Sequence, residues 1–376
     1  MNIQSMKDLL QEEKYHADSL LGIETEDLGE ENLEHNPYSP NDIRINQRIF
    51  TIYQIQHMIE TGKLFLTPDF QRNLVWDLRR KSLLIESIML GIPISSFYFQ
   101  EDYEGNKIVI DGLQRLSTIS QFLNNEFALK ELQYLNYNGY CYSDLPQKYV
   151  NKIEDTQLVA YVLDSTCHEL SKFDVFRRVN TGGMPLNSQE IRNSMAADGT
   201  RSLLKAMSRS QEFQKATRGR VKDIRMDAQE LCLRFITFYT RYDFETGCIR
   251  DLGPLAKMMD QAILDLNQMS ESNQKLYLAA FRRSMTNCHA LLGDKAFSKK
   301  TACHIINKPL FTAWSVVMAS YHGTSAYLEE ARPRIVRLQQ SYFDDGPYFS
   351  AITSSTTTAQ HIILQFEAVK KILEEL

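Results

Sequence analysis

The chain has 376 residues, of which 43% are hydrophobic and 24% are charged, and its formal net charge is −5. This composition is that of an ordinary globular protein long enough for two domains. No apolar run approaches the roughly 18 residues needed to span a bilayer, and the N-terminus lacks the basic-then-apolar pattern of a secretory signal. These features exclude a membrane partner and favour a cytoplasmic location.

The six cysteines are scattered along the chain without a C-x-x-C pair. In a chain of this size we expect them to be reduced and mostly buried. The steps Cys288-His289 and Cys303-His304 lack the spacing of zinc ligands. We therefore predict no metal site built from protein ligands.

Acidic residues are concentrated at the start of the chain, because residues 1–45 contain 11 Asp or Glu and 3 Lys or Arg. An acidic N-terminal arm of this kind is usually solvated and partly disordered. The alternative is that the arm covers a basic surface of the protein when nucleic acid is absent.

Strand and helix patterns alternate through the first half of the chain. The segment 47–66 predicts a strand that runs into a short helix ending at Gly62, and a helix over 77–90 is stopped by Gly91. Strands are predicted over 94–100 and 107–111. The second of these strands runs through Asp111-Gly112 directly into an amphipathic helix that uses Leu116, Ile119 and Leu123.

Two further strands are predicted over 127–135 and 156–164, with a short helix near Pro146 between them. A helix over 168–180 leads to a loop, after which Asn187 and Glu190 form a capping pattern for the next helix. Beyond about residue 188 strand patterns nearly vanish and long helical patterns dominate. The sequence therefore predicts an α+β domain over 46–200 and an all-helical domain over 201–376.

The turn from Asp111 to Thr118 is a candidate anion site. A helix N-terminus presents unpaired N–H groups and partial positive charge, and Gly112 allows an anion to approach the backbone closely. Arg115 can bind phosphate oxygens in a bidentate manner, and Ser117 and Thr118 add hydroxyl donors. Asp111 could position a metal ion or a water, or could simply cap the helix. The alternative is a plain tight turn with Arg115 on the surface.

Two loops could complete such a site. Gln71 and Arg72 lie in a polar loop between apolar anchors, which would suit the wall of a polar ligand site. Asn180, Thr181 and Gly182 belong to a glycine-rich loop that could fold over a phosphate. The alternatives are a solvated loop for the first and a simple helix connector for the second.

Four stretches, taken in order, resemble the GmrS N-terminal-domain family: PDFQRNLVW, LIESIMLGIPI, VIDGLQRLSTI and RRVNTGGMPLNSQEIRN. RMDAQELCLRFITFY also resembles the first C-terminal helix of that family, so the resemblance runs from about residue 46 to 240. The family is typified by the S half of the modification-dependent GmrSD restriction enzymes and by related phage-defence proteins.

The resemblance implies a ParB/sulfiredoxin-like core in which a strand–Gly–x–x–Arg–helix turn holds the phosphates of a nucleotide. The family signature Asp-Gly-Gln-Gln-Arg falls on Asp111, Gly112, Gln114 and Arg115, and Leu113 replaces the middle glutamine. On this reading Asp111, Gln114 and Arg115 are the catalytic residues of an NTPase that uses ATP, GTP or CTP with Mg²⁺. If the missing glutamine is needed for turnover, the protein is instead a non-catalytic sensor that recruits a separate effector.

Many relatives carry or pair with an HNH nuclease, but the sequence shows no His-Asn-His arrangement, so a nuclease is expected on a separate chain. The segment 215–225 is a candidate DNA-binding surface, because five basic residues crowd around one glycine and could grip a phosphate backbone. They are Lys215, Arg218, Arg220, Lys222 and Arg225. The alternative is that this segment is a solvated loop between helices. The segment ARPRIVR, from Ala331 to Arg337, is a weaker second candidate for DNA binding. The sequence also leaves open whether the protein forms a homo-oligomer.

Overall fold

The computed structural model describes residues 22–27, 38–39, 42–66, 76–179, 187–299, 305–344 and 346–376. The chain divides into two compact units. One unit runs from Pro37 to Ser194, and the other combines residues 1–36 with residues 195–376. The first unit contains a small mixed sheet and the second is helical, so the α+β class with a helical C-terminal region is confirmed.

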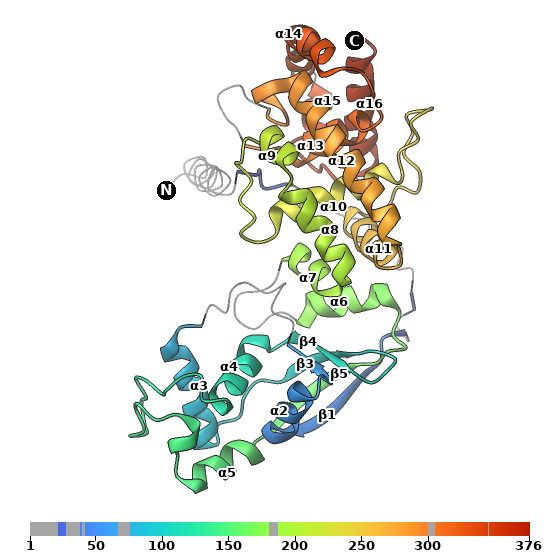
Figure 1. Cartoon of the computed structure of the whole chain (residues 1–376). Coiled ribbons are helices and arrows are strands. Elements are labelled where there is room, and N and C mark those ends of the chain that lie inside the picture. Colours follow the sequence, from blue (N-terminus) through green and yellow to red (C-terminus); the bar gives the residue numbers. More distant parts are fainter. Residues whose placement is uncertain are drawn as a thin grey trace, which may run out of the picture. The chain divides into compact units, whose positions relative to one another are not determined.

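The sheet of the first unit has five strands in the order β1-β5-β3-β4-β2 (Figure 1). Pairing alternates across it: β1–β5 and β3–β4 are antiparallel, whereas β5–β3 and β4–β2 are parallel. The strands are β1 (Ile45–Thr51), β2 (Leu64–Phe65), β3 (Phe97–Glu101), β4 (Lys107–Asp111) and β5 (Gln157–Leu163).

One face of this sheet forms the core of the unit. Because side chains alternate along a strand, Phe97 and Phe99 of β3 point to the same face as Leu158 and Val162 of β5, and all four are buried. Four helices contribute apolar residues to the same core cluster. They are α2 (Ile52–Glu60), α3 (Leu78–Leu90), α4 (Leu113–Leu123) and α5 (Gln147–Asp155).

The helix ends follow the local signals of the sequence. α2 begins with a capping box in which Thr51 and Gln54 bond each other reciprocally, and α3 begins at Asp77, whose carboxylate accepts the Arg80 N–H at 2.7 Å. Gly91 ends α3 in the left-handed conformation. The helices predicted over 77–90 and near Pro146 are thus confirmed.

The unit ends with α6 (Glu169–Val179) and α7 (Ser188–Met195). Asn187 Oδ1 accepts the Glu190 N–H at 2.7 Å, and Glu190 Oε2 accepts the Asn187 N–H at 2.7 Å. This reciprocal pair is a capping box, so the predicted start of α7 is confirmed.

The strand predicted over 127–135 is wrong, because this segment forms a loop. Four of its backbone N–H groups donate to side chains of α3 and none pairs with a strand of the sheet. The buried Glu86 carboxylate accepts the N–H groups of Gln133, Tyr134 and Leu135 at 2.9, 2.7 and 2.8 Å. These three hydrogen bonds to the Glu86 carboxylate take the place of the inter-strand hydrogen bonds that a strand would make.

The second unit is helical throughout its described C-terminal part, apart from short turns and isolated bridges. The long helical patterns predicted beyond residue 188 are confirmed, with α10 and α12 among the helices formed. Its helices are α8 (Asp198–Ser208), α9 (Gln211–Ala216), α10 (Asp227–Tyr239), α11 (Leu255–Asn267), α12 (Glu271–Leu292), α13 (Lys308–Met318), α14 (Ser325–Tyr342), α15 (Gly346–Ala351) and α16 (Ala359–Leu373), with the short η4 (Gly293–Lys295) after α12.

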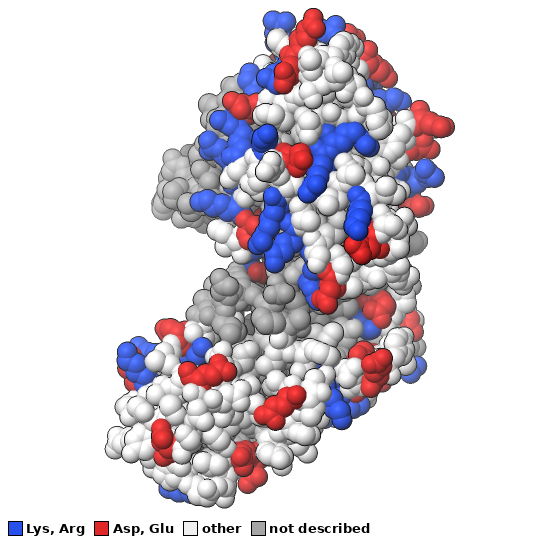
Figure 2. Space-filling model, in the orientation of Figure 1, with Lys and Arg blue, Asp and Glu red and all other residues white. Residues whose placement is uncertain are grey.

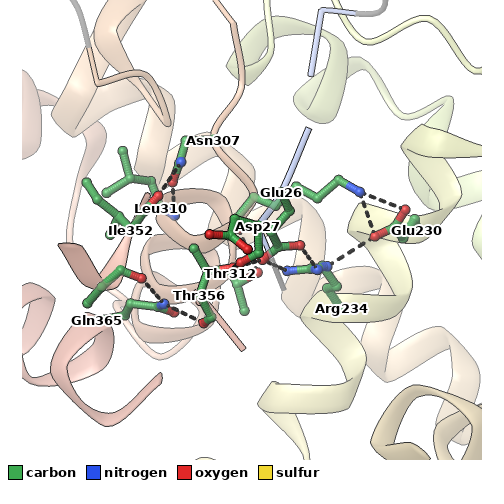
Figure 3. A network of polar contacts seen from close by, with 12 residues as sticks. Glu26, Asp27, Glu230, Arg234, Asn307, Leu310, Thr312, Ile352, Thr356 and Gln365 are labelled. Carbon is green, nitrogen blue, oxygen red and sulfur yellow. Dashed lines mark hydrogen bonds and ion pairs between the residues drawn. The ribbon is translucent and has the colours of Figure 1, made fainter. Parts of the chain in front are cut away.

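Residues 22–27 of the acidic segment pack into this helical unit (Figure 3). Ile23 forms a parallel bridge with Ile306, and the Glu26 carboxylate is ion-paired with Arg234 of α10. The side chains of Glu26 and Arg234 are only 5% and 4% exposed. In this segment Gly22, Ile23 and the side chain of Glu26 are packed, whereas Thr25 and Asp27 are exposed. The solvated arm predicted from the acidic composition is therefore wrong for the packed residues.

Of the described cysteines, Cys167, Cys232 and Cys288 are buried, and none forms a disulfide. No helix in the described ranges is both long and apolar enough to cross a membrane.

Candidate functional site

The turn between β4 and α4 requires glycine at position 112. Gly112 has φ +100°, a left-handed conformation that side chains disfavour. A Cβ at this position would lie 2.3 Å from Cδ1 of Phe97. The strand therefore reaches the helix through a backbone that passes directly over the Phe97 ring.

The first turn of α4 leaves backbone donors open. Gly112 provides no side-chain cap, and the Leu116 N–H is the donor that bonds the Gly112 carbonyl, at 2.8 Å. No described residue accepts a hydrogen bond from the N–H groups of Leu113, Gln114 or Arg115. Open N–H groups at a helix N-terminus favour an anion.

Arg115 is held by the chain itself. Its Nη1 donates to the carbonyl and, at 2.7 Å, to the hydroxyl of Ser95, and its Nη2 donates to the Ser96 carbonyl at 3.1 Å. Nη2 also donates to Asp111 Oδ2 at 3.1 Å, and the guanidinium lies 4.4 Å from the centre of the Phe97 ring. Arg115 thus connects the start of α4 to the residues before β3. A bound phosphate would have to compete with these acceptors for the Arg115 guanidinium.

Asp111 lies at the end of β4 beside this cation. Burial raises the pKa of the Asp111 carboxyl above its ordinary value of 3.8, and it outweighs the lowering by the Arg115 charge and the Gly112 N–H. Burial likewise lowers the pKa of Arg115, against the opposing effect of Asp111. The two groups form a partly desolvated pair at the mouth of the turn.

Gln114 has an unused acceptor, because its Oε1 atom is buried and accepts no hydrogen bond from the described residues. Leu113 is 4% exposed and belongs to the hydrophobic core. Ser117 is half-buried. Thr118 is 1% exposed and its hydroxyl donates to the Gln114 carbonyl at 2.7 Å. The donor of the Thr118 hydroxyl is therefore already used within the helix.

The two loops predicted to close the site, with Gln71 and Arg72 in one and Asn180, Thr181 and Gly182 in the other, lie outside the described residues. Sequence reasoning missed Ser95, Ser96 and Phe97, which hold and orient Arg115. No local signal marks them, because serine carbonyls before a strand carry no motif.

The basic segment 215–225 covers the end of α9 and the loop that follows it in the helical unit. Lys215, Arg218, Arg220 and Lys222 are exposed, whereas Arg225 is half-buried. The buried Val221 anchors the loop, and Arg218 forms an ion pair with Asp294 at 3.5 Å. The loop therefore presents cations to solvent from a fixed base.

Further cations lie near this loop in the helical unit. Figure 2 shows Lys and Arg side chains gathered over α8, α9 and α12. Lys205 and Arg209, one turn apart at the end of α8, are exposed and have no described ion partner. Their i, i+4 spacing on a polar helix face was the signal that could have marked them.

Comparison with known proteins found a family match. Residues 52–197 match the family described as GmrSD restriction endonuclease, N-terminal domain. This match confirms the resemblance to the GmrSD N-terminal-domain family over that segment. The match covers less than half of the 376 residues. No curated protein and no solved structure matches the chain.

Proposed function

We propose that this chain is a nucleotide-binding, DNA-recognising protein of a bacterial restriction or anti-phage system, acting in the cytoplasm, and that a separate chain supplies the nuclease. The match to a restriction endonuclease N-terminal-domain family supports a role in a restriction system. The ParB/sulfiredoxin-like class is part of the proposal, because the mixed sheet carries the strand–Gly–x–x–Arg–helix turn expected of it.

The open first turn of α4 is the observation that carries the proposal. Three backbone N–H groups, those of residues 113–115, have no described acceptor. Gly112 keeps the approach free of a side chain, and Arg115 adds positive charge beside it. Helix N-termini with this combination bind phosphate through backbone donors and the helix dipole.

Arg115 has two roles in this proposal. In the described contacts it braces the turn against Ser95 and Ser96. When a nucleotide binds, the Arg115 guanidinium neutralises the charge of the phosphates. Asp111 competes with the phosphates for the N–H groups of this guanidinium. Asp111 is therefore placed to orient the cation.

Magnesium would arrive with the nucleotide. No group of three His, Cys, Asp or Glu side chains in the described ranges could hold a metal ion. Mg²⁺ in phosphate sites is typically bound by one or two carboxylates together with substrate oxygens and water. Asp111 is the carboxylate at this turn that fits that role, and the ion would neutralise phosphate charge there.

Hydrolysis is tested by phosphate release from ATP, GTP and CTP with Mg²⁺, with and without DNA. Gln114→Ala is the sharpest variant, because its Oε1 has no described partner and its loss should leave the fold intact. If Gln114 orients the attacking water, release should fall by about 100-fold with nucleotide affinity unchanged. Arg115→Ala should weaken nucleotide binding by about tenfold or more. Unchanged affinity in a folded Arg115→Ala protein would contradict the proposal.

The second candidate function is a sensor that binds nucleotide without turnover and recruits an effector chain. Leu113 favours it, because the residue in the middle of the signature is apolar and packed into the core. Such a side chain cannot orient a water molecule. Nucleotide binding without phosphate release in the wild type would select this function over the NTPase.

A further inference from the structure

A second cationic site lies in the helical unit. A cavity of about 640 Å³ opens between the end of α12, η4 and α14, and we call it the η4–α14 cavity. Its described lining includes the basic residues Lys295, Arg332 and Arg337. The carboxylate in this lining is that of Asp294, which already forms an ion pair with Arg218. The cavity therefore has an excess of positive charge.

The cations of the cavity differ in how they are held. Arg332 is fixed, because its Nε donates to the Ala290 carbonyl at 2.8 Å and its Nη2 to the His289 carbonyl at 3.3 Å, at the end of α12. Its Nη2 also forms a long ion pair, at 3.9 Å, with the Glu329 carboxylate. Lys295 and Arg337 have no ion partner in the described parts of the chain. Two unpaired cations beside a fixed guanidinium form a preorganised site for an anion.

The remaining lining is suited to an organic ligand. Leu292 and Val336 give the cavity an apolar wall, and Gln340 adds an amide. The Nδ1 atom of His289 is buried and has no hydrogen-bond partner among the described residues. Sites for small ligands are typically about 300–1,000 Å³, mostly apolar, with a few fixed polar groups.

We propose that the η4–α14 cavity binds a small organic phosphate of nucleoside-phosphate size. Lys295, Arg332 and Arg337 hold the phosphate, and the wall of Leu292 and Val336 contacts the organic part. This site is separate from the turn at Gly112, and its proposal does not rest on nucleotide binding there.

The test uses the full chain and calorimetric titration with AMP, with adenosine as the ligand that lacks the phosphate. We expect AMP to bind the wild type. Adenosine should bind the wild type about tenfold or more weakly than AMP does, and the Lys295→Gln/Arg337→Gln double variant should bind AMP about tenfold or more weakly than the wild type does. Lys275→Gln/Lys371→Gln is the matched control, because it removes two exposed cations of the same unit outside the cavity. This control should bind AMP as the wild type does.

A second measurement locates the ligand. AMP should slow the acylation of Lys295 by a lysine-reactive reagent, measured by mass spectrometry, and leave Lys275 unaffected. Three results would overturn the proposal: no AMP binding at millimolar concentration, equal affinity in the Lys295→Gln/Arg337→Gln variant, or protection of Lys295 by a DNA duplex but not by AMP. Loss of AMP binding in Arg115→Ala alone would assign the ligand to the turn at Gly112.

Discussion

Arg115 Nη2 donates to Asp111 Oδ2 at 3.1 Å across the first turn of α4, and both side chains are mostly enclosed, with 13% and 24% exposure. The pair joins the end of a strand to the start of a helix at the point where three backbone donors are open. Its protonation and its neighbours determine several measurable properties of the protein.

The first prediction concerns pH. Burial raises the pKa of Asp111 above 3.8, so the folded state holds this proton more tightly than the unfolded state. The wild type should therefore gain stability relative to Asp111→Asn as the pH falls from above the raised pKa towards 3.8. Urea unfolding of both proteins across that range measures the difference. A constant difference, or one of opposite sign, would show that Asp111 is not desolvated.

The second prediction concerns Gly112. Gly112→Ala should destabilise the first unit by about 2–3 kcal/mol, because it combines an unfavourable φ with a Cβ 2.3 Å from Phe97. Gly62→Ala is the matched control, since Gly62 has φ +67° and no atom within 4 Å of the added Cβ. The control should cost about 1 kcal/mol. Equal losses in the two variants would mean that the Phe97 ring simply moves aside.

The third prediction concerns the anchor of the acidic segment. Arg234 bonds both Glu26 and Glu230, and the attraction of these carboxylates outweighs the lowering of its pKa by burial, so its pKa is raised. Arg234→Met should cost about 3–5 kcal/mol, because it leaves Glu26 buried without its cation.

Glu26→Gln in the Arg234→Met background is the control for that prediction. The double variant should recover part of the loss, since the unpaired buried charge is gone. Thermal unfolding of the four proteins completes the cycle. Additive losses would mean that Glu26 and Arg234 do not stabilise each other.

The fourth prediction concerns DNA. Arg220 and Lys222 are exposed on the loop after α9. If both contact phosphates of duplex DNA, Arg220→Gln/Lys222→Gln should lower the slope of log affinity against log salt by about 1.8. Lys275→Gln/Lys371→Gln removes the same charge elsewhere and should leave the slope unchanged. Equal slopes for all three proteins would remove this loop from the DNA-binding surface.

Much of the fold could be predicted because its signals are local. Asp77 and Gly91 bound α3, and Asn187 with Glu190 starts α7, since caps depend on residues within one turn. The Gly112 turn follows for the same reason. These features needed only the sequence within a few positions of each other.

What the sequence missed depends on distant partners. The segment 127–135 has strand-like residues, but its N–H groups bond Glu86, 47 to 49 positions away. Glu26 and Arg234 are 208 positions apart, so composition alone made the acidic segment look solvated. The contacts of Arg115 with Ser95 and Ser96 are likewise set by the sheet, and no spacing rule finds them.

The most direct test of the account is amide hydrogen exchange of the full chain, resolved at residues 113–115, with and without non-hydrolysable analogues of ATP, GTP and CTP in the presence of Mg²⁺. The account predicts that at least one analogue binds and slows exchange of the amides of Leu113, Gln114 and Arg115, because these N–H groups then bond phosphate oxygens. Exchange near residues 293–295 reports separately on the η4–α14 cavity. If a nucleotide binds and the amides of 113–115 exchange as before, or if no analogue binds at millimolar concentration, the β4–α4 turn is not a nucleotide site.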